Sequence, residues 1–274
     1  MVQRYEDVIG LIPAAGKASR LSPLPCSKEL FPLGFQQFGP KAEMRPKVAA
    51  HFLLEKMRLA NIRKAYVILR EGKWDIPGYF GDGEMLDMSL AYLMMGLPFG
   101  VPYTLDQAYP FVDRSLVALG FPDMVFEPDD AFVQLLAKRE GRDADIVLGL
   151  FPAHKPHKTD MVELDGSGRV RSLEIKPRQT AHRYAWEIAV WTPAFTRFMH
   201  EFLSSTLPGH DGHGADGSRG AHETHVADVI QAAIDEGLAV DAVTFESGSC
   251  LDIGTPDDLF TAVQSQVQKH PTDR

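Results

Sequence analysis

The sequence has 274 residues, of which 45% are apolar and 24% charged, and its net charge is −9. This composition is typical of a soluble globular protein with enough chain for a sizeable core, in one large domain or two small ones. The acidic balance argues against general binding to nucleic acid or to a membrane surface.

The cysteines point to a reducing compartment. Cys26 and Cys250 are the only two and stand far apart, which is no disulfide framework and indicates the cytoplasm. The N-terminal residues show no secretory apolar core, and no run approaches the roughly 18 apolar residues of a membrane span. An anionic ligand would therefore need a locally basic pocket on a protein that is acidic overall.

Short apolar runs alternate with helical patterns in the first half of the chain. Strands are predicted at residues 8–12, 65–69, 116–121 and 145–151, and helices at residues 48–60 and 129–140. Strand and helix alternating with short links are typical of a mainly parallel sheet covered by helices on both faces.

The second half changes character. Residues 160–177 are predicted to form two strands, joined by an Asp-Gly-Ser-Gly turn whose residues accept left-handed conformations. A strand at 183–191, a helix at 225–237 and a strand–loop–helix unit at 242–263 follow. The expected fold is therefore an α/β domain over residues 1–274, with a Rossmann-like, mixed, mainly parallel sheet flanked by helices and with extra antiparallel strands in its second half.

One break in composition occurs at residues 207–225, which are rich in glycine and histidine. Their histidines have the side chains for a transition-metal site: His210, His213, His222 and His225. No cysteine accompanies them and glycines separate them, which favours a mobile loop instead.

Residues 10–30, GLIPAAGKASRLSPLPCSKEL, join a predicted strand to a turn of small residues and to three cations. Such a turn lets a phosphate approach the backbone at Ala14, Ala15 and Gly16, and the cations Lys17, Arg20 and Lys28 supply charge. The spacing is neither a Walker loop nor a dinucleotide G-x-G-x-x-G motif. On the local pattern alone, a strand–helix turn with solvated basic residues is the alternative.

This stretch resembles the N-terminal signature of the sugar-1-phosphate nucleotidylyltransferases, the family of the glucose-1-phosphate uridylyl- and thymidylyltransferases. The signature reads approximately P-A-A-G-x-G-T-R-L-x-P-x-T-x-x-x-P-K-E-L-x-P. The matching residues are Pro13, Ala14, Ala15, Gly16, Arg20, Leu21, Pro23, Lys28, Glu29, Leu30 and Pro32. Further segments are similar to the family in the same order, at residues 45–69, 119–128, 162–177 and 250–263. Together they span about residues 8 to 264.

The resemblance implies a nucleotidylyltransferase, or pyrophosphorylase. It would join a nucleoside triphosphate to a sugar-1-phosphate, giving a nucleotide-sugar and pyrophosphate. The turn from Ala14 to Lys17 would bind the nucleotide, with the backbone after Gly16 and the side chain of Arg20 on the departing pyrophosphate. Lys28 would lie on the α-phosphate. Residues 1–150 would form the nucleotide-binding half and residues 151–274 the sugar-binding half.

The resemblance also implies a metal and an acceptor site. Asp123 and Asp252, 129 positions apart, would bind Mg²⁺, which prefers carboxylate and phosphate oxygens. Lys176 would hold the sugar phosphate, and Glu223 occupies a place where the family often has a sugar-contacting acid. Members of the family are often oligomeric, so a homo-oligomer is an expectation as well.

Each of these roles has a structural alternative. Asp123 follows Pro122 and fits a turn, Asp252 fits a cap of the helix that begins near Thr255, and Lys176 fits an ordinary lysine at a strand end.

Several positions depart from the family pattern. Ala18 replaces a glycine that permits unusual backbone angles, and Ser27 replaces a proline, which is expected to loosen the approach of Lys28. Ile175 stands where the family has a sugar-binding glutamate, and Glu174, one residue away in a strand, would face the opposite side. Met95 stands near the position where the family has a glutamine that contacts the nucleotide base. This leaves Gln107 as the candidate base contact in this sequence.

These departures keep a second hypothesis open, in which the chain is a non-catalytic nucleotide or nucleotide-sugar binding module with a regulatory role. A nicotinamide-dependent dehydrogenase is disfavoured, because the loop lacks G-x-G-x-x-G and no acidic residue ends a second strand where the ribose would need it.

Overall fold

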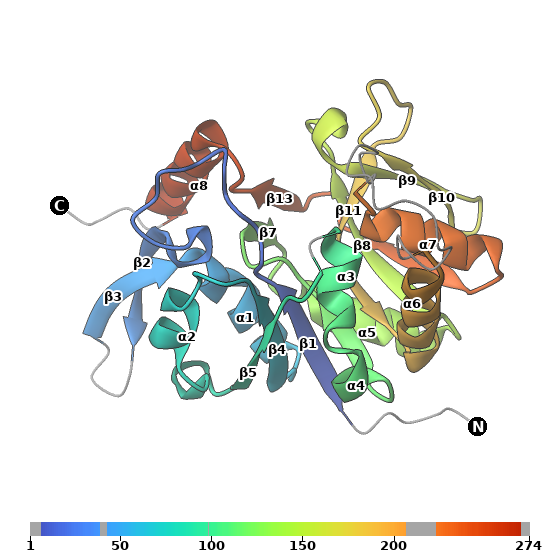
Figure 1. Ribbon diagram of the computed structural model, residues 1–274. Coiled ribbons are helices and arrows are strands. Elements are labelled where there is room, and N and C mark those ends of the chain that lie inside the picture. The colour runs from blue at the N-terminus through green and yellow to red at the C-terminus, as the bar shows by residue number, and fades with distance from the viewer. Residues whose placement is uncertain (1–6, 39–42, 98, 207–222, 270–274) are drawn as a thin grey trace, which may run out of the picture.

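One nine-stranded sheet runs through the computed structural model, which describes residues 7–38, 43–97, 99–206 and 223–269 (Figure 1). The strands are β1 (Val8–Pro13), β2 (Pro32–Phe38), β3 (Glu43–Val48), β4 (Lys64–Leu69), β5 (Ser89–Met94), β6 (Leu116–Leu119), β7 (Met124–Glu127), β8 (Ile146–Pro152), β9 (Asp160–Leu164), β10 (Val170–Ile175), β11 (Tyr184–Trp191), β12 (Val240–Thr244) and β13 (Ser249–Asp252). The helices are α1 (Ala49–Leu59), α2 (Asp75–Phe80), α3 (Val101–Asp106), α4 (Tyr109–Val112), α5 (Ala131–Gly141), α6 (Pro193–Thr206), α7 (Val226–Asp235) and α8 (Pro256–Lys269), with short 3₁₀ turns η1 (Lys28–Leu30), η2 (Glu84–Leu86) and η3 (Pro156–Lys158).

The sheet is mixed, as predicted. Its N-terminal part is parallel: β1 pairs with β4 on one side and β6 on the other, and β4 pairs with β5. Strand β11 then runs antiparallel to both β6 and β8, and the antiparallel hairpin β9–β10 extends the sheet beyond it. The predicted extra antiparallel strands of the second half are therefore confirmed.

Helices cover both faces of the sheet, and alternate residues of its inner strands, such as β1, β6 and β8, fill two different cores. In β1, Leu11 packs with α3, α4, α6 and α7, while Ile12 packs with α1, α2 and α5. A third cluster joins α8 to the small β7–β13 sheet and to β2, around Leu33 and Ile253. Each large side chain that is fully buried in these cores contributes roughly 1.5–3 kcal/mol relative to an exposed position.

The predicted turn between β9 and β10 is also confirmed. Asp165 Oδ1 accepts hydrogen bonds from Ser167 N, Ser167 Oγ and Arg169 N at 2.7–3.0 Å, and Gly168 has a φ of +82°. These contacts fix the hairpin and hence the position of Lys176 just after β10.

Two other predictions have different outcomes. The β2–β3 hairpin, β5 and helices α2, α3, α4 and α6 were not among the predicted elements. The predicted loop, with His210, His213 and His222, falls on residues 207–222 outside the described residues, while His225 is described and precedes α7. Among the described residues, no helix has the length and apolar character to cross a membrane.

A buried histidine makes the fold sensitive to acid. His51 in α1 is 0% exposed, and its Nδ1 accepts a hydrogen bond from the Val48 N–H at 3.0 Å. Burial and, second, the charge of Lys47 lower the pKa of His51 from 6.5 to about 4. The folded protein therefore prefers the neutral imidazole.

We expect this preference to appear in the pH dependence of unfolding. The folded pKa lies below the unfolded one, so the stabilisation is complete above pH 6.5 and is lost as the pH falls towards 4. Between pH 7 and pH 4, wild type is expected to lose about 3 kcal/mol more unfolding free energy in urea than His51→Gln. An NMR titration of His51 with a midpoint near 6.5 would contradict this.

Candidate functional site

The loop after β1 leaves the sheet at the carboxyl end of the parallel strands. Ala14 N donates to Ile68 O at 2.8 Å, which continues the pairing with β4 for one residue before the chain turns away. Gly16 is exposed, and a Cβ added to it would lie 3.9 Å from Lys28 Nζ. Backbone and cation are thus close together at the sheet edge, where α/β proteins hold phosphates.

Ala18 keeps the backbone shape that a glycine would adopt. Its φ is +51°, in the left-handed region, and its carbonyl accepts from Leu21 N and Ser22 N at 3.0 and 3.1 Å. Left-handed geometry costs a non-glycine residue roughly 1–2 kcal/mol. The turn itself holds alanine in this conformation, so the loop is retained.

Ala18→Gly is therefore expected to stabilise the protein. Glycine relieves the strain of the left-handed conformation but also has a larger entropy in the unfolded chain. The net expected gain in the free energy of unfolding is about 0.5–1 kcal/mol, which raises the melting temperature by about 1–3 °C. Ala15→Gly is the matched control, since Ala15 has no positive φ and glycine there is expected to destabilise. A lower melting temperature for Ala18→Gly would refute this account.

Lys28 is held firmly, contrary to the looser approach expected from Ser27. The side chain of Asp75, at the start of α2, accepts hydrogen bonds from Ser27 N and Ser27 Oγ, both at 2.7 Å. Next to Lys28, the buried carboxylate of Glu29 pairs with Lys73 Nζ at 2.5 Å. These two anchors fix η1 on both sides of Lys28.

A basic cavity of about 360 Å³ lies beside this loop. It is lined by Lys17, Ala18, Ser22, Leu24, Pro25, Cys26, Ser27, Lys28, Gly72, Lys73 and Asp75. All of these residues come from the first 75 positions of the chain, and three of them are lysines.

The small β7–β13 sheet brings Asp123 and Asp252 together. Asp252 lies opposite Met124 in the antiparallel register, and Ile253 N donates to Asp123 O at 3.0 Å. Lys28 forms an ion pair with Asp123. Arg20 lies close to Asp252, because the side chains of both approach Gly254. A Cβ added to Gly254 would stand 2.7 Å from Asp252 Oδ2 and 3.0 Å from Arg20 Nη2. Two carboxylates and two cations from three segments of the chain therefore meet at one place.

The charges of this cluster are strongly coupled. Desolvation and the nearby charge of Asp123 raise the pKa of Asp252 to about 6, although Lys28 and Arg20 partly oppose this. Burial opposes the charge of Lys28, but Asp123 outweighs it and raises the pKa of Lys28. Two carboxylates that repel each other beside a cavity are a suitable donor set for Mg²⁺, which commonly takes one or two carboxylates plus phosphate oxygens.

The helix-cap alternative for Asp252 is not what the structure shows. Thr255 Oγ1 accepts from Asp258 N at 3.3 Å and donates to Asp258 Oδ2 at 2.6 Å, so Thr255 and Asp258 cap α8. Asp258 also pairs with Lys155 and Lys158 at 2.7 and 3.2 Å. Burial opposes its charge, but these hydrogen bonds outweigh that and lower the pKa of Asp258 to about 2.

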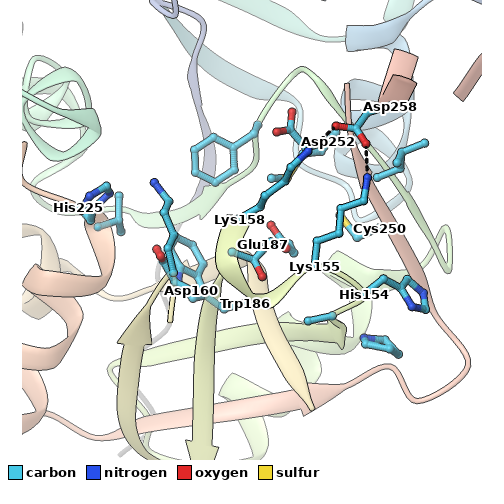
Figure 2. Close-up of a pocket in the computed structure, with 18 of the residues that line it drawn as sticks. His154, Lys155, Lys158, Asp160, Trp186, Glu187, His225, Cys250, Asp252 and Asp258 are labelled. Carbon is cyan, nitrogen blue, oxygen red and sulfur yellow. Dashed lines mark hydrogen bonds and ion pairs between the residues drawn. The ribbon is translucent and has the colours of Figure 1, made fainter. Parts of the chain in front are cut away.

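A second cavity, of about 440 Å³, opens next to Asp252 (Figure 2). Lys176 lies on its wall with a φ of +42°, a strained conformation of the kind that accumulates at functional sites. Asp160, from β9, lies on the same wall. Burial raises the pKa of Asp160, and the charges of Lys176 and His225 oppose that rise.

A β-bulge in β11 turns a further acid into this cavity. The register against β8 pairs Trp186 with Leu150 and Ile188 with Gly149, so Glu187 is an extra residue. In a regular strand Trp186 and Glu187 would face opposite sides, yet both line the cavity. Glu187 is not among the site residues predicted from the sequence, because no local sequence pattern indicates a bulge.

The remaining candidates lie elsewhere. The Gln107 amide donates to Tyr103 O at 3.4 Å and lines neither of the two cavities. Glu223 is exposed and lines neither cavity, although His225 and Val226 line the second. Glu174 faces away as expected, because its carboxylate accepts from Thr180 Oγ1 at 2.7 Å outside the cavity.

Comparison with known proteins identifies the family of the chain. The family model described as nucleotidyl transferase matches residues 9–269. The low-salt glycan biosynthesis nucleotidyltransferase Agl11 of Haloferax volcanii is 24% identical over 257 residues, and the match covers 93% of this chain and 65% of that protein. A glucose-1-phosphate thymidylyltransferase of Streptomyces griseus is 26% identical over 254 residues, covering 91% and 63%. The chain thus spans less than two thirds of the length of these curated relatives.

Solved structures share the fold. A UDP-glucose pyrophosphorylase complexed with UDP-glucose superposes with a TM-score of 0.77 at 15% identity, covering 96% of this chain and 99% of the other. A UTP-bound UGPase from Acinetobacter baumannii gives a TM-score of 0.75 at 14% identity, covering 97% and 95%.

Proposed function

The chain belongs to the nucleotidyl transferase family, and we propose that it joins a nucleoside triphosphate to a sugar-1-phosphate, forming a nucleotide-sugar and pyrophosphate. The observation that carries this proposal is the meeting of Lys28, Asp123 and Asp252 at the sheet edge, with one cavity beside Lys28 and another beside Asp252. The names of the relatives, a glycan-biosynthesis nucleotidyltransferase and glucose-1-phosphate thymidylyltransferases, support the same reaction.

The reaction needs positioning and charge neutralisation more than covalent help. An oxygen of the sugar phosphate bonds to the α-phosphorus while the bond from that phosphorus to the oxygen bridging to the β-phosphate breaks. Pyrophosphate leaves with the electron pair, and no redox step occurs. The protein has to hold two anions in line and offset their repulsion.

The residues divide these tasks. The turn from Ala14 to Lys17 offers its backbone to the triphosphate, and Arg20 holds the departing pyrophosphate. Lys28, fixed by the anchors on either side of it, lies on the α-phosphate. Lys176 holds the acceptor phosphate. Gln107 and Glu223 stay predictions as base and sugar contacts.

Asp123 and Asp252 would hold Mg²⁺, which when bound would draw charge from the phosphate oxygens and offset the anionic cluster. Lys28 pairs with Asp123 and so orients this carboxylate.

The two cavities also support a division of the chain. The basic cavity is lined by residues 17–75, and most of the lining of the second lies after residue 150. We assign the nucleotide to the half formed by residues 1–150 and the acceptor to the half formed by residues 151–274. A cytoplasmic location and a homo-oligomer remain predictions from the sequence.

The test is pyrophosphate release with Mg²⁺, measured for UTP, dTTP, CTP, ATP and GTP, each with a panel of sugar-1-phosphates. Release with one pair, abolished by EDTA and restored by Mg²⁺, would establish the enzyme and its metal. Nucleotide binding in calorimetry without release from any pair would contradict the proposal and favour the non-catalytic binding module.

A further inference from the structure

Glu187 is an acid for which the described part of the chain supplies no counter-charge. Its side chain lines the second cavity, the residue is 8% exposed, and no described residue gives it a hydrogen bond or an ion pair. Burial first, and then the charges of Asp252, Asp160 and Asp123, raise the pKa of Glu187 to about 8. Every charged neighbour that shifts this pKa is another acid.

The cations of the cavity lie beside other acids than Glu187. Lys155 and Lys158 both pair with Asp258, and Lys176 and His225 act on Asp160. Buried carboxyl groups are normally hydrogen-bonded or paired with a cation. The carboxyl group of Glu187 has no such partner among the described residues, which favours a partner from outside the chain.

A second observation points to a ligand at the same place. Trp186 is 5% exposed, and its indole N–H is buried without a hydrogen-bond partner among the described residues. Asp160 Oδ1 is a buried acceptor in the same condition. A donor and an acceptor thus belong to residues that line the cavity where Glu187 lies, and neither is satisfied within the described part of the chain.

Glu187 is not placed to bind a metal ion itself. Within the described residues, no three His, Cys, Asp or Glu side chains are placed to share one metal. Glu187 is therefore not a third ligand beside Asp123 and Asp252. The bulge that turns Glu187 into the cavity gives it a separate position, towards the part of the cavity lined by Asp160 and Trp186 (Figure 2).

We propose that the acceptor is an amino-sugar 1-phosphate with a free, protonated amino group, bound by Glu187 and Asp160, with the Trp186 N–H donating to a sugar oxygen. This inference rests on the proposed function and names the acceptor class of that site. An ammonium group would provide the positive charge that Glu187 lacks and N–H donors for both carboxyl groups. It would favour the ionised form of Glu187, whereas a sugar with hydroxyl groups alone would leave this buried carboxyl group protonated.

The test compares acceptors that differ only at nitrogen. Pyrophosphate release is measured with glucose 1-phosphate, with its 2-, 3-, 4- and 6-amino-deoxy analogues, and with the N-acetyl derivative of each amine. We expect one free amine to exceed both glucose 1-phosphate and its own N-acetyl derivative by at least about tenfold in kcat/KM, because a site built for a polar group rejects analogues that lack it. Calorimetric binding of the same acceptors to the enzyme is expected to follow the same order.

Variants assign the preference to Glu187. In Glu187→Gln, which keeps the shape and removes the charge, the amine is expected to keep an advantage of no more than about threefold over glucose 1-phosphate. Glu174→Gln is the matched control, because that carboxylate bonds to Thr180 outside the cavity, and it should leave the ratio unchanged. Thermal melting of each variant shows whether it is folded.

The outcomes separate this inference from the proposed function. Turnover of glucose 1-phosphate or of an N-acetyl sugar that equals or exceeds every free amine would overturn the amine site and leave the nucleotidylyltransferase standing. A preference for the amine that persists in Glu187→Gln would overturn the role of Glu187. Absence of release with every acceptor and nucleotide would overturn the proposed function itself.

Discussion

Asp252→Asn is expected to lower kcat for pyrophosphate release by about a thousandfold. The substitution removes one of the two carboxylates that would hold Mg²⁺ and leaves the geometry of β13 intact. It also removes the burial of a charged group and the repulsion by Asp123, which together raise the pKa of Asp252 to about 6. The folded protein should therefore melt at the same temperature or higher while it loses activity. Steady-state kinetics and thermal melting on the same preparation measure both effects.

The control for this variant is Asp257→Asn. Asp257 is an exposed carboxylate in the first turn of α8, only five positions along the chain. It should retain full activity, which would rule out a general loss of negative charge as the cause. If Asp252→Asn kept more than a tenth of wild-type activity at saturating Mg²⁺, the metal role of Asp252 would be untenable.

Lys28→Met should lower kcat by about a hundredfold to a thousandfold, with a smaller change in the KM for the triphosphate. The reason is that Lys28 combines two roles. It pairs with Asp123, and its Nζ lies near Gly16 in the phosphate-binding loop. Loss of its charge removes stabilisation where negative charge is redistributed during transfer, and it leaves Asp123 without its partner.

Lys64→Met provides a comparison for Lys28→Met. Lys64 is exposed at the start of β4, at the opposite end of the strand from the site, and pairs there with Asp7 at 2.6 Å. Its loss should change neither kcat nor KM. A change of less than about fivefold in kcat for Lys28→Met would show that the lysine has a structural role only.

The class of fold could be predicted from the sequence, and the loop after the first strand could be singled out as a candidate for phosphate binding. Apolar runs such as those of β1 and β8 are recognisable because strands that are buried on both faces contain few polar residues. The loop was recognisable because its small residues and cations are contiguous. The turn after Asp165 was recognisable for the same reason, since it depends on residues within five positions of one another.

Several short helices and strands could not be predicted from the sequence. The β2–β3 hairpin, with the sequences PLGFQQF and EMRPKV, contains prolines and polar residues and is exposed along much of β3. Helices α3 and α4 have six and four residues, too few to show a helical period. Their formation depends on packing against α6 and β1 rather than on local preference.

Tertiary structure alone decided which charges face one another. Asp123 and Asp252 meet because β7 and β13 pair across a separation of more than 100 residues, and no local pattern encodes that register. Strand alternation correctly predicted that Glu174 faces away from the second cavity, but no sequence pattern shows that a bulge turns Glu187 into that cavity. Turns and loops depend on residues that are adjacent in the sequence. The candidate site depends on distant segments of the chain, which only the folded sheet brings together.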